Sequence, residues 1–187
     1  MKHIILASNS PRRRELLSGL DFDFEVKVLS DIDESYPDSL PVVEVAGYIS
    51  RKKAASYQTL IEDNNLVITA DTVVIVGNEV LGKPKDTEEA HRMLRLISGR
   101  THQVITGVCL LTKDKQHSFS VTTDVTFKQL SDDEITYYIE HYKPFDKAGA
   151  YGIQEWIGYI GVTSINGSYF NVMGLPVQRL WDEIKKL

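Results

Sequence analysis

Short runs of apolar residues alternate along the chain with longer stretches in which apolar residues recur every three or four positions. The runs are rich in Val, Ile and Leu and are typical of buried strands, whereas the recurring pattern indicates amphipathic helices. We expect strands over 4–7, 22–29, 66–76, 103–112 and 117–127. We expect helices to begin at Pro11, Pro41, Asp86, Ser131 and Pro176. The alternation predicts an α/β fold with a mixed sheet, as one domain over 1–187 or as two closely packed lobes.

Polar and glycine-containing segments set the expected ends of these elements. Gly77-Asn78 is typical of a hairpin tip, and the polar segment 113–116 predicts a second hairpin between the last two strands. The helix from Ser131 starts with a capping box. The helix from Pro41 is expected to continue for about two dozen residues. The segment 148–170 is rich in glycine and aromatic residues and is expected to be irregular.

Composition narrows the class of protein. Of the 187 residues, 42% are hydrophobic and 25% are charged, which is typical of a soluble globular protein. A net charge of −5 argues against nucleic acid as a partner. No run approaches the roughly 20 apolar residues of a membrane span, and the apolar run at the start is too short for a signal peptide. The single cysteine, Cys109, lies in an apolar strand, which predicts a buried structural thiol and a cytoplasmic location.

The first helix carries an unusual charge pattern. Ser10 is a favoured N-cap, and Pro11 is tolerated at the first helical position. The next three residues, 12–14, are all arginine, although the positive end of the helix dipole favours acidic residues there. Free N–H groups beside guanidinium groups make a site for phosphate. Taken alone, the same run is equally well explained as a solvated basic turn.

Four further charged residues stand at the ends of apolar elements or within them. Asp71 interrupts a strand, where an unpaired carboxylate would be costly to bury. Glu34 offers a second carboxylate on an acidic loop, while Lys53 and Lys83 could pair with phosphate oxygens. Each of these has an ordinary alternative as a salt-bridge, cap or surface residue. Together they match phosphoryl chemistry, in which carboxylates hold Mg²⁺ while Arg and Lys hold phosphates.

Three other patterns do not lead to a function. Segment 77–83 fits the start of a P-loop, but Pro84 stands where the loop needs a Ser or Thr to bind Mg²⁺. Segment 50–53 matches S-x-x-K without the partner motifs that would make it a nucleophile. The five histidines show no spacing typical of a zinc site.

Taken in order, these motifs resemble the Maf family of nucleoside triphosphate pyrophosphatases, once linked to septum formation, and the resemblance runs nearly end to end. The matching blocks are Ser8-x-Ser10-Pro11-Arg12-Arg13-x-Glu15-Leu16-Leu17, Asp33-Glu34, Lys53-Ala54, Ala70-Asp71-Thr72-Val73-Val74, Gly82-Lys83-Pro84, Ser98-Gly99-x-Thr101-His102, Thr106-Gly107-Val108, Lys147-Ala148-Gly149-Ala150-Tyr151-Gly152-Ile153-Gln154 and Gly167-Ser168-x-x-Asn171-Val172-x-Gly174-Leu175-Pro176. The resemblance implies an elongated, twisted mixed β-sheet flanked by helices, similar to the ITPase fold, with a cleft between two lobes.

The resemblance also implies a reaction and a set of roles. Water attacks the α-phosphorus of a nucleoside triphosphate and releases a monophosphate and pyrophosphate. By resemblance, Asp71 is the general base, and Glu34 and Asp71 bind a divalent cation, Mg²⁺ or Mn²⁺. The phosphate ligands implied are Ser8, Arg12, Lys53 and Lys83.

Base preference is expected to depend on three positions of the family pattern, Arg13, Thr72 and Gln154. The Arg pair after Pro11 and the glutamine at 154 resemble the dTTP/UTP type. A glutamine amide can accept from the N3–H of uracil or thymine and donate to a ring carbonyl. The alternatives are a related pyrophosphatase that prefers 7-methyl-GTP or another base, and a nucleotide-sensing regulator of division without catalysis. A homodimer is expected from family analogy alone.

Overall fold

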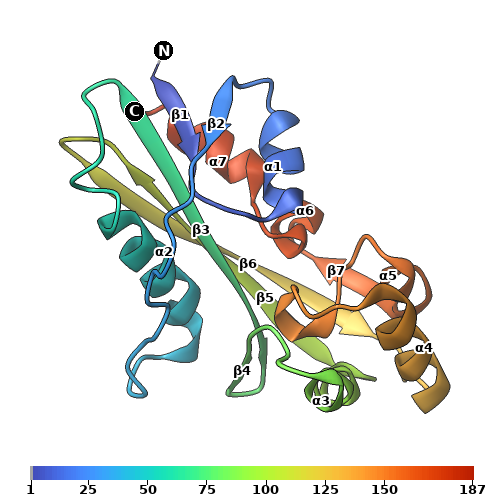
Figure 1. Cartoon of the computed structure of the whole chain (residues 1–187). Coiled ribbons are helices and arrows are strands. Elements are labelled where there is room, and N and C mark those ends of the chain that lie inside the picture. Colours follow the sequence, from blue (N-terminus) through green and yellow to red (C-terminus); the bar gives the residue numbers. More distant parts are fainter. Residues whose placement is uncertain (1) are drawn as a thin grey trace. The chain divides into compact units, whose positions relative to one another are not determined.

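The computed structural model describes residues 2–187, and Figure 1 shows its elements along the chain. The strands are β1 (His3–Leu6), β2 (Phe24–Val26), β3 (Asn65–Val76), β4 (Glu79–Leu81), β5 (Thr101–Leu111), β6 (Gln116–Phe127) and β7 (Val162–Asn166). The α-helices are α1 (Pro11–Ser18), α2 (Val45–Ala55), α3 (Thr87–Ile97), α4 (Asp132–Tyr142), α5 (Trp156–Gly161), α6 (Tyr169–Met173) and α7 (Val177–Ile184). No helix within 2–187 is both long enough and apolar enough to cross a membrane.

The strands form one mixed sheet, as predicted. Its order is β2-β1-β3-β5-β6-β7, and β4 pairs with β3 outside this path. β1 runs parallel to both β2 and β3, while β4 and β7 run antiparallel to their partners. The hairpin at Gly77 is confirmed: Gly77 has φ +61°, a conformation that glycine adopts without steric cost.

The chain divides into two compact units. Unit 1 comprises the described residues of Met1–Thr72, together with Thr106–Val121 and Gly174–Leu187. Unit 2 comprises Val73–Ile105 and Thr122–Met173. The division falls inside β3, β5 and β6, so each of these long strands contributes residues to both units.

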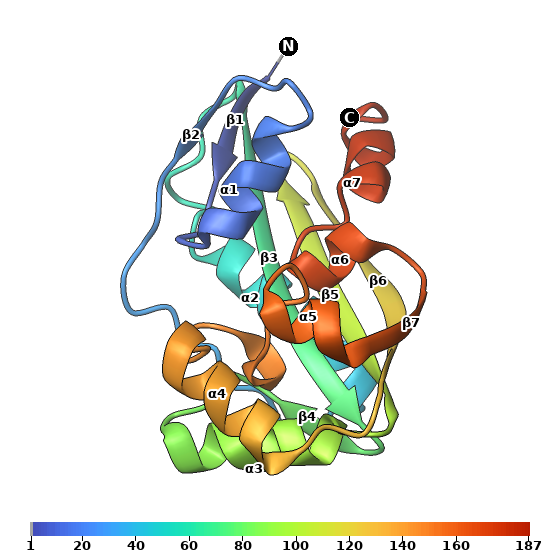
Figure 2. The same cartoon turned by 90° about the vertical axis from the view of Figure 1, so that its right-hand side faces the viewer.

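In unit 1, helices cover both faces of the sheet around β1. The two views show α1 and α7 on one face and α2 on the other (Figures 1 and 2). The core beneath α2 is apolar and contains Ile5, Val67, Cys109 and Leu111. Cys109 is buried, as predicted for a structural thiol, and burial raises its pKa to about 11. It is therefore a thiol at neutral pH and a poor nucleophile.

Helix α2 lies unusually close to strand β5. A Cβ atom on Gly107 would clash with the backbone of Ala46 and Gly47 in the first turn of α2. Thr69, on β3, donates a 2.7 Å hydrogen bond from its hydroxyl to the carbonyl of Ser50 in α2. These contacts fix the height of α2 over the sheet.

Unit 2 has its own apolar core, to which α3, α4 and the segment around Tyr151 contribute. The predicted capping box of α4 is present: the Ser131 hydroxyl accepts from the Glu134 N–H, and the Glu134 carboxylate accepts from the Ser131 N–H. Helix α3 begins after Asp86, as expected, with the Asp86 side chain as its cap, and it ends at Ile97.

Three sequence-based expectations were wrong, and two of them concern unit 1. The helix expected from Pro41 is shorter, because a 3₁₀ turn (Val42–Glu44) precedes α2 and the helix ends at Ala55. Tyr57 follows as a buried residue whose hydroxyl accepts from the Leu29 N–H and donates to the Lys27 carbonyl, which holds the chain in a turn. The strand expected over 22–29 is reduced to β2 (Phe24–Val26).

The segment 148–170 is not irregular as a whole. It contains a 3₁₀ turn (Ala148–Ala150), helix α5 and strand β7, and it leads into α6. Glycine serves close packing here: a Cβ atom on Gly161 would lie 2.9 Å from the ring of Phe127. The backbone of β7 forms its hydrogen bonds by pairing with β6, a distant contact that the local sequence pattern does not predict.

Unit 2 contains a buried histidine whose charge state makes stability depend on pH. His102 is 1% exposed, and its Nε2 lies 2.6 Å from the Tyr151 hydroxyl. Its Nδ1 has no hydrogen-bond partner within the described chain. Burial lowers the pKa of His102 to about 4, because the charged form loses its hydration.

We expect unit 2 to lose about 3 kcal/mol of stability as the pH falls from about 6.5 to about 4. In that window the unfolded chain binds a proton that folded His102 rejects, and below it the loss levels off. Urea unfolding of a Trp181→Phe protein, followed by Trp156 fluorescence, measures this. His102→Gln should flatten the dependence, and equal slopes in both proteins would contradict the assignment to His102.

Candidate active site

Lys53 and Asp71 form the centre of a charged cluster in unit 1. Asp71 lies in β3 between buried Ala70 and half-buried Thr72, and its side chain is 13% exposed. Lys53 comes from α2, and its Nζ lies 3.0 Å from Asp71 Oδ1 and 3.1 Å from Glu34 Oε1. Its side chain is 15% exposed. One poorly hydrated ammonium group therefore bridges two carboxylates. This ion pair offsets the desolvation free energy of placing the Asp71 carboxylate in an apolar strand.

The loop that carries Glu34 is fixed by the neighbouring lysine of α2. Lys52 donates to Asp33 Oδ2 at 2.5 Å and to the Ser35 carbonyl at 2.8 Å. The hydrogen bond from Lys52 holds the pKa of Asp33 well below its usual range, with help from the N–H and hydroxyl of Ser35. Lys52 thus pairs with Asp33, and the next residue, Lys53, pairs with Glu34.

The Arg13 guanidinium links distant segments of unit 1. Its Nε donates to the Gly174 carbonyl at 2.7 Å, and its Nη1 donates to the Ala70 carbonyl at 3.1 Å. Its Nη2 donates to Thr72 Oγ1 at 3.0 Å, and Nη1 also lies 3.4 Å from Ser8 Oγ. Burial lowers the pKa of Arg13, and the nearby Asp71 carboxylate partly opposes this effect. Because its N–H groups donate to the protein's own carbonyls and hydroxyls, Arg13 joins α1 to β3 and to the chain at Gly174.

The turn after β1 prepares the start of α1. The Ser10 hydroxyl accepts from the Arg13 N–H, as expected of an N-cap, and Pro11 opens the helix. Ser8 is buried, and its hydroxyl accepts from the Ser10 N–H at 3.2 Å. Within α1, which the structure describes in full, the first turn carries no acidic residue. Arg12 is half-buried in this turn.

The structure adds two residues to the site that the sequence pattern did not identify as site residues. Thr106 Oγ1 lies 2.9 Å from Thr72 Oγ1 and extends the hydrogen-bond chain from Arg13. Gly174 accepts from Arg13 and has φ +119°, which favours glycine. Both stand in the motif blocks quoted above, but a motif does not say which donor a carbonyl or hydroxyl will meet.

The remaining predicted residues, Lys83 and Gln154, belong to unit 2. Lys83 is exposed and follows Gly82, whose carbonyl accepts from the Gly149 N–H at 3.1 Å. Gln154 is half-buried, and its Oε1 is a buried acceptor without a partner among residues 2–187. The structure thus brings Ser8, Arg13, Glu34, Lys53, Asp71 and Thr72 into one arrangement in unit 1. That Lys83 and Gln154 act on the same substrate stays a prediction.

The carboxylates of unit 1 suit a divalent cation in part. In the described part of the chain, no group of three or more His, Cys, Asp or Glu side chains is arranged to hold a metal ion. Glu34 and Asp71 nevertheless direct oxygens at one cationic nitrogen, and Mg²⁺ is commonly bound by one or two carboxylates together with substrate phosphates. The donor set therefore fits a cation that arrives with a polyphosphate.

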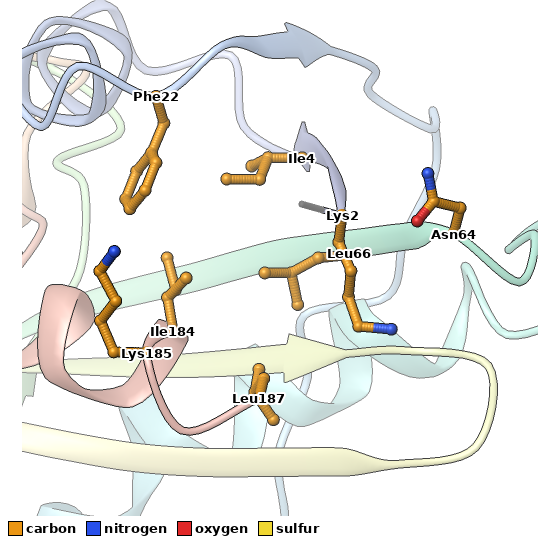
Figure 3. A pocket seen from close by; sticks show the side chains of 8 residues that line it. All are labelled: Lys2, Ile4, Phe22, Asn64, Leu66, Ile184, Lys185 and Leu187. Atoms are coloured by element: carbon orange, nitrogen blue, oxygen red, sulfur yellow. The ribbon is translucent and has the colours of Figure 1, made fainter.

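A pocket of about 350 Å³ lies elsewhere in unit 1 (Figure 3). Ile4, Leu66 and Leu187 give it apolar walls, and Lys2 and Lys185 stand at its rim. None of the predicted site residues lines it, and its lining residues include no Asp or Glu. The predicted site residues that the structure brings together lie instead around Lys53.

Solved structures with a similar fold cover the whole chain. The structure of the Staphylococcus aureus Ham1 protein matches with a TM-score of 0.58 and 17% identity, covering 99% of each chain. A HAM1 protein from Coxiella burnetii matches with a TM-score of 0.54 and 15% identity, covering 100% of each. At this identity the likeness establishes the fold, which is of the Ham1 type, as the ITPase-like expectation implied.

Sequence comparison is more specific: the chain belongs to the Maf-like protein family, whose model matches residues 3–187. A dTTP/UTP pyrophosphatase of Parabacteroides distasonis is 62% identical over 182 residues, which are 97% of this chain and 94% of that protein. A dTTP/UTP pyrophosphatase of Phocaeicola vulgatus is 61% identical over 184 residues, 98% of this chain and 95% of that protein.

Replacing Arg13 should destabilise unit 1 even without substrate. We expect Arg13→Met to lower the free energy of unfolding by roughly 3 kcal/mol, because it removes the side-chain donor to the Gly174 carbonyl and the shorter of the two side-chain hydrogen bonds to the Ala70 carbonyl, which also accepts from Lys53. Arg14→Met, which also removes one positive charge but from an exposed side chain, should change it by less than about 0.5 kcal/mol. Urea unfolding of Trp156→Phe proteins, followed by Trp181 fluorescence, measures unit 1. Equal losses in the two variants would show that Arg13 is not a structural link.

Proposed function

We propose that this protein hydrolyses dTTP and UTP to the nucleoside monophosphate and pyrophosphate. The observation that carries the proposal is the full-length similarity to relatives named dTTP/UTP pyrophosphatase. The cluster of Lys53 with Glu34 and Asp71 supports it, because it combines a proton acceptor, cation ligands and a phosphate ligand in one place.

In the proposed reaction, a water oxygen attacks the α-phosphorus while the bond from that phosphorus to the bridging oxygen breaks. Pyrophosphate leaves with the electron pair, and Asp71 accepts the proton of the water. Ser8, Arg12 and Lys53, with Lys83, hold the phosphates and stabilise the charge that builds on the leaving group. The excess of positive charge at the start of α1 is then balanced by the substrate.

A divalent cation, Mg²⁺ or Mn²⁺, held by Glu34 and Asp71 would neutralise phosphate charge and make the bound water more acidic. In the structure, Lys53 donates to Asp71 Oδ1, one of the oxygens that would receive the proton or hold the cation. If the Lys53 ammonium group donates to a phosphate oxygen of the substrate instead, it no longer pairs with Asp71 and Glu34. Both carboxylates then become free at the same time. Lys53 thus couples arrival of the triphosphate to release of the carboxylates.

Base selection is assigned to Gln154, with Thr72 and Arg13 as the other family positions. The buried Oε1 of Gln154 has no partner in the described chain, so an N–H of a ligand would satisfy it. The N3–H of uracil or thymine is such a donor, and the amide nitrogen can donate to a neighbouring ring carbonyl. Cytosine carries no proton on N3, so it cannot make this hydrogen bond and would have to present its N4 amino group to Oε1 from a different position.

The cellular setting follows from weaker observations. We propose a cytoplasmic location, supported by the single, buried, unpaired Cys109. We propose a nucleoside triphosphate as the partner molecule and no nucleic acid, in keeping with the net charge of −5. A homodimer stays a prediction from family analogy, and sedimentation of the purified protein would measure it.

The site of attack can be tested with labelled water. In H₂¹⁸O, hydrolysis of dTTP should place ¹⁸O in the monophosphate, and EDTA should abolish turnover. Asp71→Asn should lower kcat by roughly 10²-fold or more, the usual scale for loss of a general base. Asp63→Asn, an exposed acid of unit 1 that pairs with Lys113 away from the cluster, serves as the matched control. Label in pyrophosphate, release of orthophosphate, or normal turnover of folded Asp71→Asn would each overturn this mechanism.

Gln154→Glu should change base preference more than overall activity. The variant keeps an acceptor but replaces the NH₂ donor, so it should oppose a ring carbonyl of uracil or thymine. We expect the preference for dTTP and UTP over CTP and 7-methyl-GTP to shift by roughly ten- to a hundred-fold. The measurement is kcat/KM for the four nucleotides. A uniform decrease would mean that Gln154 does not read the base.

A further inference from the structure

The segment 147–155 of unit 2 holds Gln154 between two anchored neighbours. The Gly152 N–H donates to the Tyr138 hydroxyl at 3.0 Å, and the Tyr138 hydroxyl donates to Glu155 Oε2 at 2.7 Å. One phenol oxygen thus binds residues on both sides of Gln154, two positions before it and one after it. Tyr138 is fully buried in α4, and burial raises its pKa far above the usual range, so the hydroxyl keeps its proton.

A buried lysine completes this arrangement. Lys147 Nζ lies 2.9 Å from Glu155 Oε1, so Glu155 is held by Tyr138 through one oxygen and by Lys147 through the other. The Lys147 side chain is 8% exposed. Its second partner is Asp146, 2.9 Å away, whose side chain is more exposed to solvent than that of Glu155. A buried ion pair adds little net stability, because desolvation offsets the attraction, but it fixes the positions of its members.

The space beside Gly152 is filled by the same groups. A Cβ atom on Gly152 would lie 2.8 Å from Lys147 Cε and 3.1 Å from Gln154 Nε2. The Gln154 amide nitrogen therefore lies beside a backbone whose N–H is held by Tyr138. The direction in which the amide presents its donor and acceptor depends on that backbone.

We propose that Tyr138 is a positioning residue for base selection: its hydroxyl, bonded to Gly152 and Glu155, fixes the orientation of the Gln154 amide. The inference rests on the proposed function, because it assumes that Gln154 reads the base. Tyr138 itself contacts no substrate in this proposal. Removal of the Tyr138 hydroxyl should reduce the preference for one base over another, while the protein should still hydrolyse a triphosphate.

The test compares two variants that each lose one buried hydroxyl of unit 2. Tyr138→Phe removes the hydrogen bonds on both sides of Gln154. Tyr151→Phe removes a 2.6 Å hydrogen bond to His102 and leaves the Tyr138 bonds in place. Both should lower the melting temperature. We expect Tyr138→Phe to reduce the ratio of kcat/KM for UTP over CTP by about tenfold, as for one misplaced hydrogen bond, and Tyr151→Phe to keep the ratio within about twofold.

Gln154→Ala separates failure of this inference from failure of the proposed function. If Gln154→Ala loses the UTP preference and Tyr138→Phe retains it, Gln154 reads the base but Tyr138 does not position it. A ratio that falls equally in Tyr138→Phe and Tyr151→Phe would also overturn the inference, since general loosening of unit 2 would then explain both. If Gln154→Ala keeps the full preference, or the unaltered protein has none, base reading by Gln154 fails and this inference falls with it.

Discussion

A carboxylate inside an apolar strand is the constraint from which the rest of unit 1 follows. Asp71 places a carboxylate in a strand whose residues are mostly buried, and a charged group there needs a partner close by. Lys53 supplies it from α2, and the same ammonium binds Glu34. One ammonium group therefore links the helix, the acidic loop and the strand, and it adds to the backbone contact at Gly107 and to the Lys52 bonds that also hold them.

Most of the fold could be predicted from local pattern. The runs that became β3, β5 and β6 are long and rich in β-branched residues, and the capping box of α4 has a direct local mechanism. The prediction failed where distant contacts decide the structure. Tyr57 ends the helical region by bonding to the chain at Lys27 and Leu29, and β7 exists because β6 offers it an edge.

The candidate site could be predicted as a set of residues but not as a set of contacts. The motif blocks supplied Asp71, Glu34 and Lys53, while their bridging by a single ammonium group depends on how α2 lies over β3. The arginine run suggested anion binding, and the structure assigns the Arg13 donors to carbonyls and hydroxyls of the chain. Sequence alone cannot tell a guanidinium that faces a ligand from one that joins two segments.

The close contact between α2 and β5 has a consequence for how the protein tolerates change. Gly107 leaves no room for a methyl group against the backbone of Ala46 and Gly47, so any larger residue must push the helix outward. Lys53 is carried on that helix and would be drawn away from both carboxylates. A temperature-sensitive allele can therefore arise at a position that meets neither nucleotide nor metal, through the spacing of two backbones.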